Sequence, residues 1–170
     1  MRPKSSMRVV GGVAKGRRLK GAMVPGVRPT TERARAAIFN VLSPDSYLEG
    51  RVLDLFAGTG SLGIEGLSQG AAWADFVERD RRQCEVIRSN LETTGFTDQS
   101  KVYCGDAHRL LRMLTGPYRL ALLDPPYRMP DLSEFMEQLA ATPGLLEEGG
   151  IVVVGHSHRL TLRSEYGELH

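Results

Sequence analysis

The residues Asp124-Pro125-Pro126-Tyr127 have the types and the order needed for chemistry on a planar amine. Two prolines after a buried strand form a rigid loop that has no amide N–H at either proline, so that carbonyl oxygens point outward. The Asp124 carboxylate and the Pro125 carbonyl can then accept both hydrogens of an NH2 group. Tyr127 adds a ring face on which a flat base can stack. A rigid turn without function is the alternative interpretation.

An amine attached to an aromatic ring is a poor nucleophile because its lone pair is delocalised into the ring. Two acceptors that hold its hydrogens favour a pyramidal nitrogen and aim the lone pair at an electrophilic methyl carbon. Catalysis would then consist of positioning and of electrostatic interactions that strengthen toward the transition state. The four residues therefore predict group transfer to an exocyclic amine, with no metal ion and no covalent intermediate.

A glycine-rich segment lies where the first of several apolar runs ends and a helical stretch begins. Gly58 and Gly60 allow a tight turn and a close approach of a ligand to the backbone. The segment also fits the pattern G-x-G-x-x-G, with Glu78 eighteen positions after Gly60, and a nicotinamide dinucleotide site would look similar. Asp54 argues for another ligand, because its carboxylate would repel a pyrophosphate and attract the ammonium group of an amino-acid moiety.

Acidic residues also lie at or just after the ends of the next two predicted strands. Glu78 can accept both ribose hydroxyls of an adenosine, or it can be an exposed carboxylate at a strand end. Asp106 can accept from an adenine amino group, or it can cap the helix that follows. Because strand ends of open α/β sheets line the ligand crevice, we interpret both residues as ligand-binding.

From residue 51 onward, apolar β-prone runs alternate with helical stretches. This order predicts a mostly parallel sheet that is covered by helices on both faces. Because crossovers between parallel strands are right-handed, the expected result is a doubly wound, Rossmann-like α/β fold. The predicted strands are Arg51–Phe56, Trp73–Glu78, Lys101–Cys104, Leu120–Asp124 and Ile151–Val154. The predicted helices are 61–69, 80–94, 107–114 and 132–141.

The segment before this alternation is strongly basic. Residues 1–50 hold ten Lys and Arg against three Asp and Glu, a net charge of +7, whereas residues 51–170 hold twelve against seventeen, a net charge of −5. Two Gly-bounded pieces, 7–12 and 16–21, predict a β-hairpin. Thr31 can cap a helix over 32–42, whose core-facing residues by spacing are Ala34, Ala37, Ile38, Val41 and Leu42. A basic extension on an acidic domain predicts a polyanion-binding arm, and a solvated terminus is the alternative.

A length of 170 residues predicts one domain, and 41% hydrophobic with 25% charged residues is typical of soluble globular proteins. No apolar run reaches the roughly 20 residues of a membrane helix, and the N-terminus lacks a signal-peptide core, so we expect a cytoplasmic protein. Cys84 and Cys104 are too few for a disulfide framework or a zinc ribbon. They predict buried reduced thiols, and we expect no metal site.

Several motifs together resemble one family. The chain is similar to amino-methyltransferases with a D/N-P-P-Y/F motif and, over about residues 7–160, to the RsmD family of 16S rRNA guanine-N2 methyltransferases. The basic hairpin and the Arg-Pro-Thr-Thr segment make this resemblance specific, because generic methyltransferases lack them. The motifs, in chain order, are Arg8-Val-Val-Gly-Gly, Gly16-Arg-Arg-Leu, Arg28-Pro-Thr-Thr-Glu-Arg-Ala-Arg, Ile38-Phe-Asn-Val-Leu, Asp54-Leu-Phe-Ala-Gly-Thr-Gly-Ser-Leu-Gly and Asp124-Pro-Pro-Tyr.

The resemblance implies a class I, S-adenosylmethionine-dependent methyltransferase whose partner is 16S rRNA or a small-subunit assembly particle, with no membrane partner. Its catalytic residues would be Asp124, Pro125, Pro126 and Tyr127. Its cofactor-binding residues would be Asp54, Phe56, Gly58, Thr59, Gly60, Glu78, Arg79, Asp106 and Ala107. Its residues for RNA contact or for the cofactor entrance would be Arg17, Arg18, Arg28, Thr30, Arg33 and Arg35.

The implied organisation is a disordered tail at 1–6, a basic hairpin and helix at 7–48, and a cofactor-binding catalytic domain at 49–170 that forms one compact unit with 7–48. The chain departs from the family pattern at two places. Gly155 stands where relatives usually have Glu after the fifth strand, and it is assigned no function. After Val154 only sixteen residues remain, enough for one short strand near Leu160–Arg163, so we expect missing or incomplete C-terminal strands.

Other functions remain open at this level. Adenine-N6, cytosine-N4 and protein glutamine-N5 methylation share the chemistry of the tetrapeptide, and only the resemblance favours guanine-N2. An NAD-dependent oxidoreductase would explain the glycines but leaves Asp54 and the Asp124-Pro-Pro-Tyr motif without a role. A non-enzymatic RNA-binding protein with a decayed methyltransferase fold would not need Asp54, Glu78 and Asp124 together.

Overall fold

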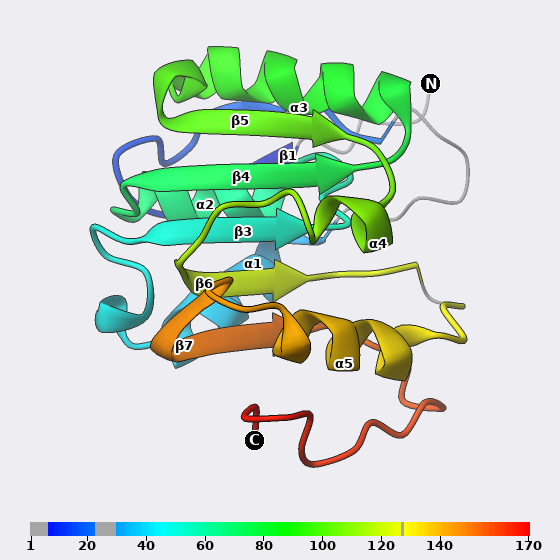
Figure 1. Cartoon of the computed structure of the whole chain (residues 1–170). Coiled ribbons are helices and arrows are strands. Elements are labelled where there is room, and N and C mark those ends of the chain that lie inside the picture. Colours follow the sequence, from blue (N-terminus) through cyan, green and yellow to red (C-terminus); the bar gives the residue numbers. More distant parts are fainter. Residues whose placement is uncertain (1–6, 23–29, 127) are drawn as a thin grey trace.

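The computed structural model describes residues 7–22, 30–126 and 128–170. Its centre is a five-stranded parallel sheet in the order β5-β4-β3-β6-β7 (Figure 1). The strands are β3 (Arg51–Leu55), β4 (Trp73–Glu78), β5 (Ser100–Cys104), β6 (Tyr118–Leu123) and β7 (Leu146–Val154). This sheet confirms the Rossmann-like α/β fold. The tail predicted at 1–6 lies outside the described residues.

Helices cover both faces of the sheet, because side chains of buried parallel strands alternate between two apolar cores. In β6, Leu120 and Leu122 belong to one core, while Ala121 and Leu123 belong to the other. The first core is covered by α1 (Glu32–Val41), α2 (Ser61–Ser68) and α3 (Arg81–Thr94). The second is covered by α4 (Ala107–Leu110) and α5 (Leu132–Ala141). Two short 3-10 helices, Pro44–Ser46 and Thr97–Gln99, lie between these elements.

The strand order reverses beside β3. The chain runs from β3 to β4 and β5 on one side and then returns to place β6 on the other side of β3. All five strands point the same way, so their carboxyl ends share one edge (Figure 1). Ligands of open α/β sheets bind at such a reversal, outside the carboxyl ends of the strands. The switch point between β3 and β6 is therefore where a ligand site is expected.

The predicted N-terminal hairpin is present as β1 (Met7–Arg8) and β2 (Arg18–Leu19), which pair antiparallel. Apolar side chains from it, among them Val9 and Leu19, are buried in the core that α2 and α3 cover. Its loop is fastened to the end of α2, where the Ser68 hydroxyl accepts from the Ala14 amide at 2.9 Å. The hairpin thus packs onto the same core as the sheet.

Helix α1 differs from the expected apolar helix. Val41, expected to face the core, is 86% exposed, whereas Arg35 and Phe39 are buried. Arg35 pairs with Glu65 of α2 at 3.0 Å, and neither side chain is exposed to solvent. Glu65 also accepts from the amides of Val10 at 2.9 Å and of Gly11 at 3.0 Å. A buried charge needs a partner, so the Arg35–Glu65 pair decides which face of α1 turns inward.

The C-terminal segment contradicts the strand expected at Leu160–Arg163. After β7 the described residues contain only an isolated bridge between Tyr166 and Leu169. The segment packs Tyr166 and neighbouring leucines against the core under α5, and the Tyr166 hydroxyl lies 2.9 Å from the Ser133 hydroxyl. Burial against α5 thus replaces strand pairing, and in the described part of the chain β7 is paired only with β6.

We expect Glu65→Ala to lower the free energy of unfolding by about 3–5 kcal/mol, because it leaves Arg35 buried without a carboxylate. It also deprives the amides of Val10 and Gly11 of their acceptor. Urea denaturation measures the loss. Glu85→Ala is the control: Glu85 pairs with Arg88 on the exposed surface of α3, so its removal should change the midpoint little. Equal midpoints for the two variants would contradict this role of Glu65.

Candidate active site

Three carboxylates lie along the carboxyl edge of the sheet on its three central strands. Asp54 is in β3, Glu78 ends β4, and Asp124 follows the last residue of β6. The strand registers place Leu55 beside both Val77 and Leu123, so the ends of these strands are level. Asp54 and Asp124 therefore flank the switch point. An edge of this kind attracts a cationic ligand.

Asp54 is the buried member of the group, with 1% of its surface exposed. Its Oδ2 accepts from the amide of Gly63 at 2.9 Å. Burial raises the pKa of Asp54 well above its usual value, and the charges of Asp124 and Glu78 raise it further, although the Gly63 hydrogen bond opposes them. A positive group at this edge would favour the ionised form of Asp54.

The glycine turn after β3 has the backbone that its sequence predicts. Gly58 and Gly60 have φ of 60° and 78°, which favour glycine, and Phe56 adopts φ of 57° although it carries a side chain. Gly60 is the N-cap residue of α2. A Cβ on Gly63 would lie 2.4 Å from the Phe76 ring, so only glycine lets α2 pack this closely on the sheet.

Glu78 holds the glycine turn as well as facing the edge. Its Oε1 accepts from the Gly58 amide at 3.0 Å, and its Oε2 accepts from the Asp80 amide at 2.7 Å. Each carboxylate oxygen keeps a second lone pair for a ligand hydroxyl. The site role proposed for Glu78 is thus compatible with these bonds.

Two residues that sequence reasoning missed also hold this turn. Gln83 donates to the Gly58 carbonyl at 2.9 Å, and Asn90 donates to the Thr59 carbonyl at 2.9 Å. Asn90 in addition exchanges two hydrogen bonds with the backbone of Lys20. Polar residues on the inward face of the helix predicted at 80–94 were the available signal. Asn90 connects the basic hairpin to the candidate cofactor site.

The other expected cofactor residues lie around the same edge. Thr59 and Ala107 are buried, Phe56 packs edge-on against Phe135 with ring centroids 5.2 Å apart, and Arg79 is exposed. Asp106 caps α4 by accepting from the His108 amide at 2.7 Å. The capping alternative for Asp106 is therefore confirmed, and its remaining lone pairs leave the ligand role as a prediction.

Asp124 and its neighbours form the far side of the switch point. Asp124 is exposed, Pro125 is buried and Pro126 is exposed. The Asp124 Oδ2 accepts from the hydroxyl of Thr30 at 2.7 Å. Tyr127 lies outside the described residues. The structure therefore places Thr30, expected to line the cofactor entrance or contact RNA, directly against the candidate catalytic carboxylate.

The basic residues of the arm divide into exposed and buried ones. Arg17, Arg18 and Arg33 are exposed, as an RNA contact requires, and Arg28 lies outside the described residues. The expectation that Arg35 contacts RNA or lines the cofactor entrance is wrong. Its side chain is fully buried in the pair with Glu65 and cannot reach a nucleic acid. The pattern of charged residues in a sequence does not distinguish a solvated arginine from one that pairs with a buried carboxylate.

A shallow surface hollow of about 370 Å³ lies beside the hairpin. It is lined by Arg8, Lys15, Arg33 and Glu32, among others. Three cations against one carboxylate make this surface positive, in agreement with an arm that attracts a polyanion.

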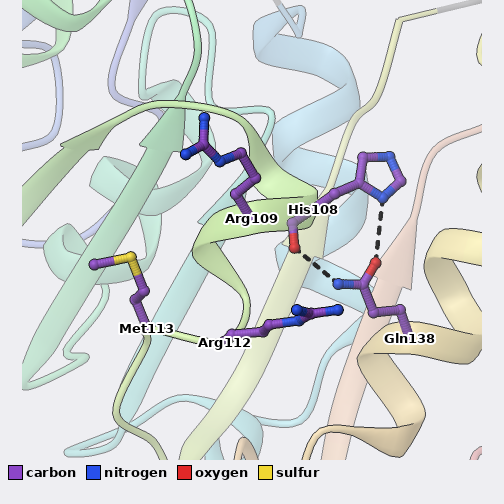
Figure 2. A pocket seen from close by; sticks show the side chains of 5 residues that line it. All are labelled: His108, Arg109, Arg112, Met113 and Gln138. Carbon is purple, nitrogen blue, oxygen red and sulfur yellow. Dashed lines mark hydrogen bonds between the residues drawn. The ribbon is translucent and has the colours of Figure 1, made fainter.

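A larger hollow of about 410 Å³ lies between α4 and α5 (Figure 2). It is lined by His108, Arg109, Arg112, Met113 and Gln138. His108 and Gln138 exchange two hydrogen bonds, at 3.2 and 2.8 Å, while the Arg109 side chain points away from Gln138 (Figure 2). None of the predicted site residues lines this hollow, so its size does not make it the active site.

The two cysteines differ from the expectation that both are buried. Cys84 is buried and Cys104 is exposed at the end of the edge strand β5, and both are free thiols. Burial raises the pKa of Cys84 to about 12, with Cys104 and Glu78 adding to the shift. Cys84 is therefore protonated at neutral pH and is no nucleophile. Among the described residues, no group of three or more His, Cys, Asp or Glu side chains could hold a metal ion.

A doubly wound parallel sheet with a glycine turn, a strand-end Glu and an Asp-Pro-Pro loop across the switch point defines a class I methyltransferase. The family described as conserved hypothetical protein 95 matches residues 7–170. The chain belongs to this family, the RsmD family of methyltransferases, which confirms the resemblance found in the sequence.

Individual relatives agree with this assignment. The chain is 40% identical to the YlbH protein of Bacillus subtilis over 168 residues, covering 96% of this chain and 89% of the relative. It is 36% identical to the Ribosomal RNA small subunit methyltransferase D of Escherichia coli K12 over 147 residues, covering 86% and 73%. The solved structure of the yhhF protein from Escherichia coli has a TM-score of 0.80 at 34% identity, covering 94% and 86%.

Asp54→Asn tests the electrostatics of the edge. A raised pKa means that the folded chain keeps a proton that the unfolded chain has released, so stability falls as pH rises from about 3.9, the usual Asp pKa, toward the raised value. Asn cannot ionise but can still accept from Gly63. We therefore expect the ligand-free variant to lose less stability than the wild type as the pH rises above about 3.9, measured by urea denaturation. Parallel pH profiles would mean that the Asp54 pKa is not raised.

Proposed function

We propose that the protein transfers a methyl group from S-adenosylmethionine to the exocyclic N2 amine of a guanine in 16S rRNA. The single observation that carries the proposal is the position of Asp124. Its carboxylate follows β6 directly across the switch point from Asp54 and Glu78. One side of the switch point is thus suited to the cofactor and the other to the amine.

The residues at the edge fit the cofactor. S-adenosylmethionine supplies an electrophilic methyl group on a sulfonium and carries an ammonium group, so it is cationic where it would meet Asp54. The buried carboxylate, whose pKa is raised by burial, gains a counter-charge in this way. Glu78 retains lone pairs for the ribose hydroxyls, and the glycine turn at Gly58 and Gly60 lets a ligand approach the backbone.

The substrate amine would be held by Asp124 and by the carbonyl of Pro125. Accepting its two hydrogens concentrates the nitrogen lone pair and aims it toward the cofactor side of the switch point. As the bond from the nitrogen to the methyl carbon forms, the bond from that carbon to the sulfonium sulfur would break and release a neutral thioether. The Asp124 carboxylate would stabilise the positive charge that the nitrogen gains more strongly than it does the ground state, and the methylated nitrogen would then lose a proton to solvent. Stacking of the base on Tyr127 stays a prediction, because Tyr127 lies outside the described residues.

The substrate class comes from the relatives and from the arm. The Escherichia coli relative is named Ribosomal RNA small subunit methyltransferase D, and the guanine-N2 target rests on the family resemblance. Adenine-N6 and cytosine-N4 are the alternatives that the same geometry would serve. Exposed Arg17, Arg18 and Arg33 supply positive charge for rRNA phosphates, free or in a small-subunit assembly particle.

Such a substrate places the proposed reaction in the cytoplasm. In the described part of the chain, no helix is long and apolar enough to cross a membrane.

Asp124→Ala should abolish methylation because it removes the acceptor for the amine. We expect 16S rRNA from cells that lack the gene to be without one N2-methylguanosine, which the wild-type gene restores and the variant does not. Mass spectrometry of rRNA nucleosides measures this modification. S-adenosylmethionine affinity, measured by calorimetry, should stay within several-fold, because Asp124 lies on the amine side. Full restoration by Asp124→Ala, or no change in any rRNA nucleoside on deletion, would contradict the proposal.

Reversing Arg17 and Arg18 to Glu should weaken RNA binding and flatten its salt dependence by about one slope unit for each phosphate that the variant no longer neutralises. Sequence preference should not change, because phosphate contacts position the RNA without reading bases. RNA affinity across a salt series measures both quantities. The matched control reverses Arg109 and Arg112, two exposed arginines on the opposite face of the sheet. An equal loss in the control would show that RNA binding is not confined to the arm.

A further inference from the structure

The candidate catalytic carboxylate is held from outside its own loop. Thr30 lies 94 residues from Asp124 in the sequence, yet its hydroxyl donates to the Asp124 Oδ2 at 2.7 Å. Asp124 is exposed, and no other described side chain donates to it. An exposed carboxylate without such a bond rotates freely about its side-chain bonds, and the hydrogen bond from Thr30 removes that freedom.

The neighbouring strand supplies no alternative support. Gly155 follows β7 directly, and its amide donates to the Leu123 carbonyl at 2.7 Å, which places it beside Asp124. A Cβ on Gly155 would lie 2.9 Å from the Asp124 Oδ1. Gly155 therefore has no side chain that could hold Asp124 from the end of β7. Among the described side chains, the Thr30 hydroxyl remains as the support.

Thr30 is itself fixed by the start of α1. Its carbonyl accepts from the Arg35 Nε at 3.4 Å, and Arg35 is locked in the buried pair with Glu65. The next residue, Thr31, is the N-cap of α1 and accepts from the Ala34 amide at 3.1 Å. The Thr30 backbone is thus held at its carbonyl and by the helix that begins after it, and a hydroxyl on a fixed backbone is a precise donor.

We propose that Thr30 is a positioning residue that orients the Asp124 carboxylate toward the substrate amine. The inference rests on the proposed role of Asp124 in methyl transfer. Thr30 occupies one lone pair of Oδ2, so that the rest of the carboxylate can accept from the amine. Orientation of a group that acts on the transition state affects kcat and not binding.

Thr30→Val removes the hydroxyl and keeps the shape of the side chain. We expect kcat for methylation of 16S rRNA to fall about tenfold or more, as loss of a hydrogen bond to a charged group predicts. KM for RNA and the dissociation constant of S-adenosylmethionine should stay within about twofold, because Thr30 then acts only on the amine side. Thr30→Ser keeps the donor and should restore at least half of the wild-type kcat.

Thr31→Val is the matched control. It changes the adjacent threonine, whose hydroxyl caps α1 and is not directed at Asp124. Loss of the cap should lower the melting temperature and change kcat by less than about twofold, because the Arg35 bond still holds the Thr30 carbonyl. Thr30→Val should show the opposite result, with kcat reduced and the melting temperature retained. A merely structural role of Thr30 would make the two variants alike.

Further outcomes separate the inference from the function on which it rests. If Asp124→Ala is inactive and Thr30→Val has wild-type kcat, the positioning role is wrong and the proposed function stands. The role is also wrong if Thr30→Ser is as slow as Thr30→Val, because the hydroxyl is then not the cause. If Asp124→Ala is fully active, the proposed site itself fails, whatever the Thr30 variants do.

Discussion

The buried ion pair between Arg35 and Glu65 is the interaction on which the arrangement of the N-terminal third depends. Neither side chain is exposed, so each charge must be met inside the protein. Glu65 pairs with Arg35 and accepts hydrogen bonds from two amides of the hairpin. Arg35 also donates to the carbonyls of Arg8 and Thr30. One pair therefore fixes the hairpin, α1 and α2 relative to each other and sets the backbone next to the candidate active site.

The carboxyl edge of the sheet carries a different electrostatic constraint. Asp54 is buried near Asp124 and Glu78, and this arrangement raises its pKa because the charged form is poorly solvated and repelled. Such a cluster lowers the stability of the ligand-free protein. A bound cation would reduce the repulsion between its carboxylates. In the proposed function, the same feature that costs folding energy would favour a positively charged ligand over a pyrophosphate.

Positive and negative charge are concentrated in different parts of the chain. The first fifty residues carry +7 and the remainder −5. Hydrogen bonds from Asn90 to Lys20 and to Thr59, and from Thr30 to Asp124, join the basic arm to both sides of the acidic switch point. In the proposed function, polyanion binding at the arm and chemistry at the edge would therefore share one hydrogen-bonded frame.

Local patterns in the sequence determined where the strands and the glycine turn form and which acidic residues lie at the strand ends. These patterns are the hydrophobic periods of two and 3.6 residues and the backbone preferences, which act within a few residues. They did not determine that Arg35 faces inward, that Val41 faces solvent, or that the C-terminal segment packs on α5 in place of a strand. Those choices depend on partners far along the chain, such as Glu65 for Arg35. The contact between Thr30 and Asp124 spans 94 residues, so only the tertiary structure could decide it.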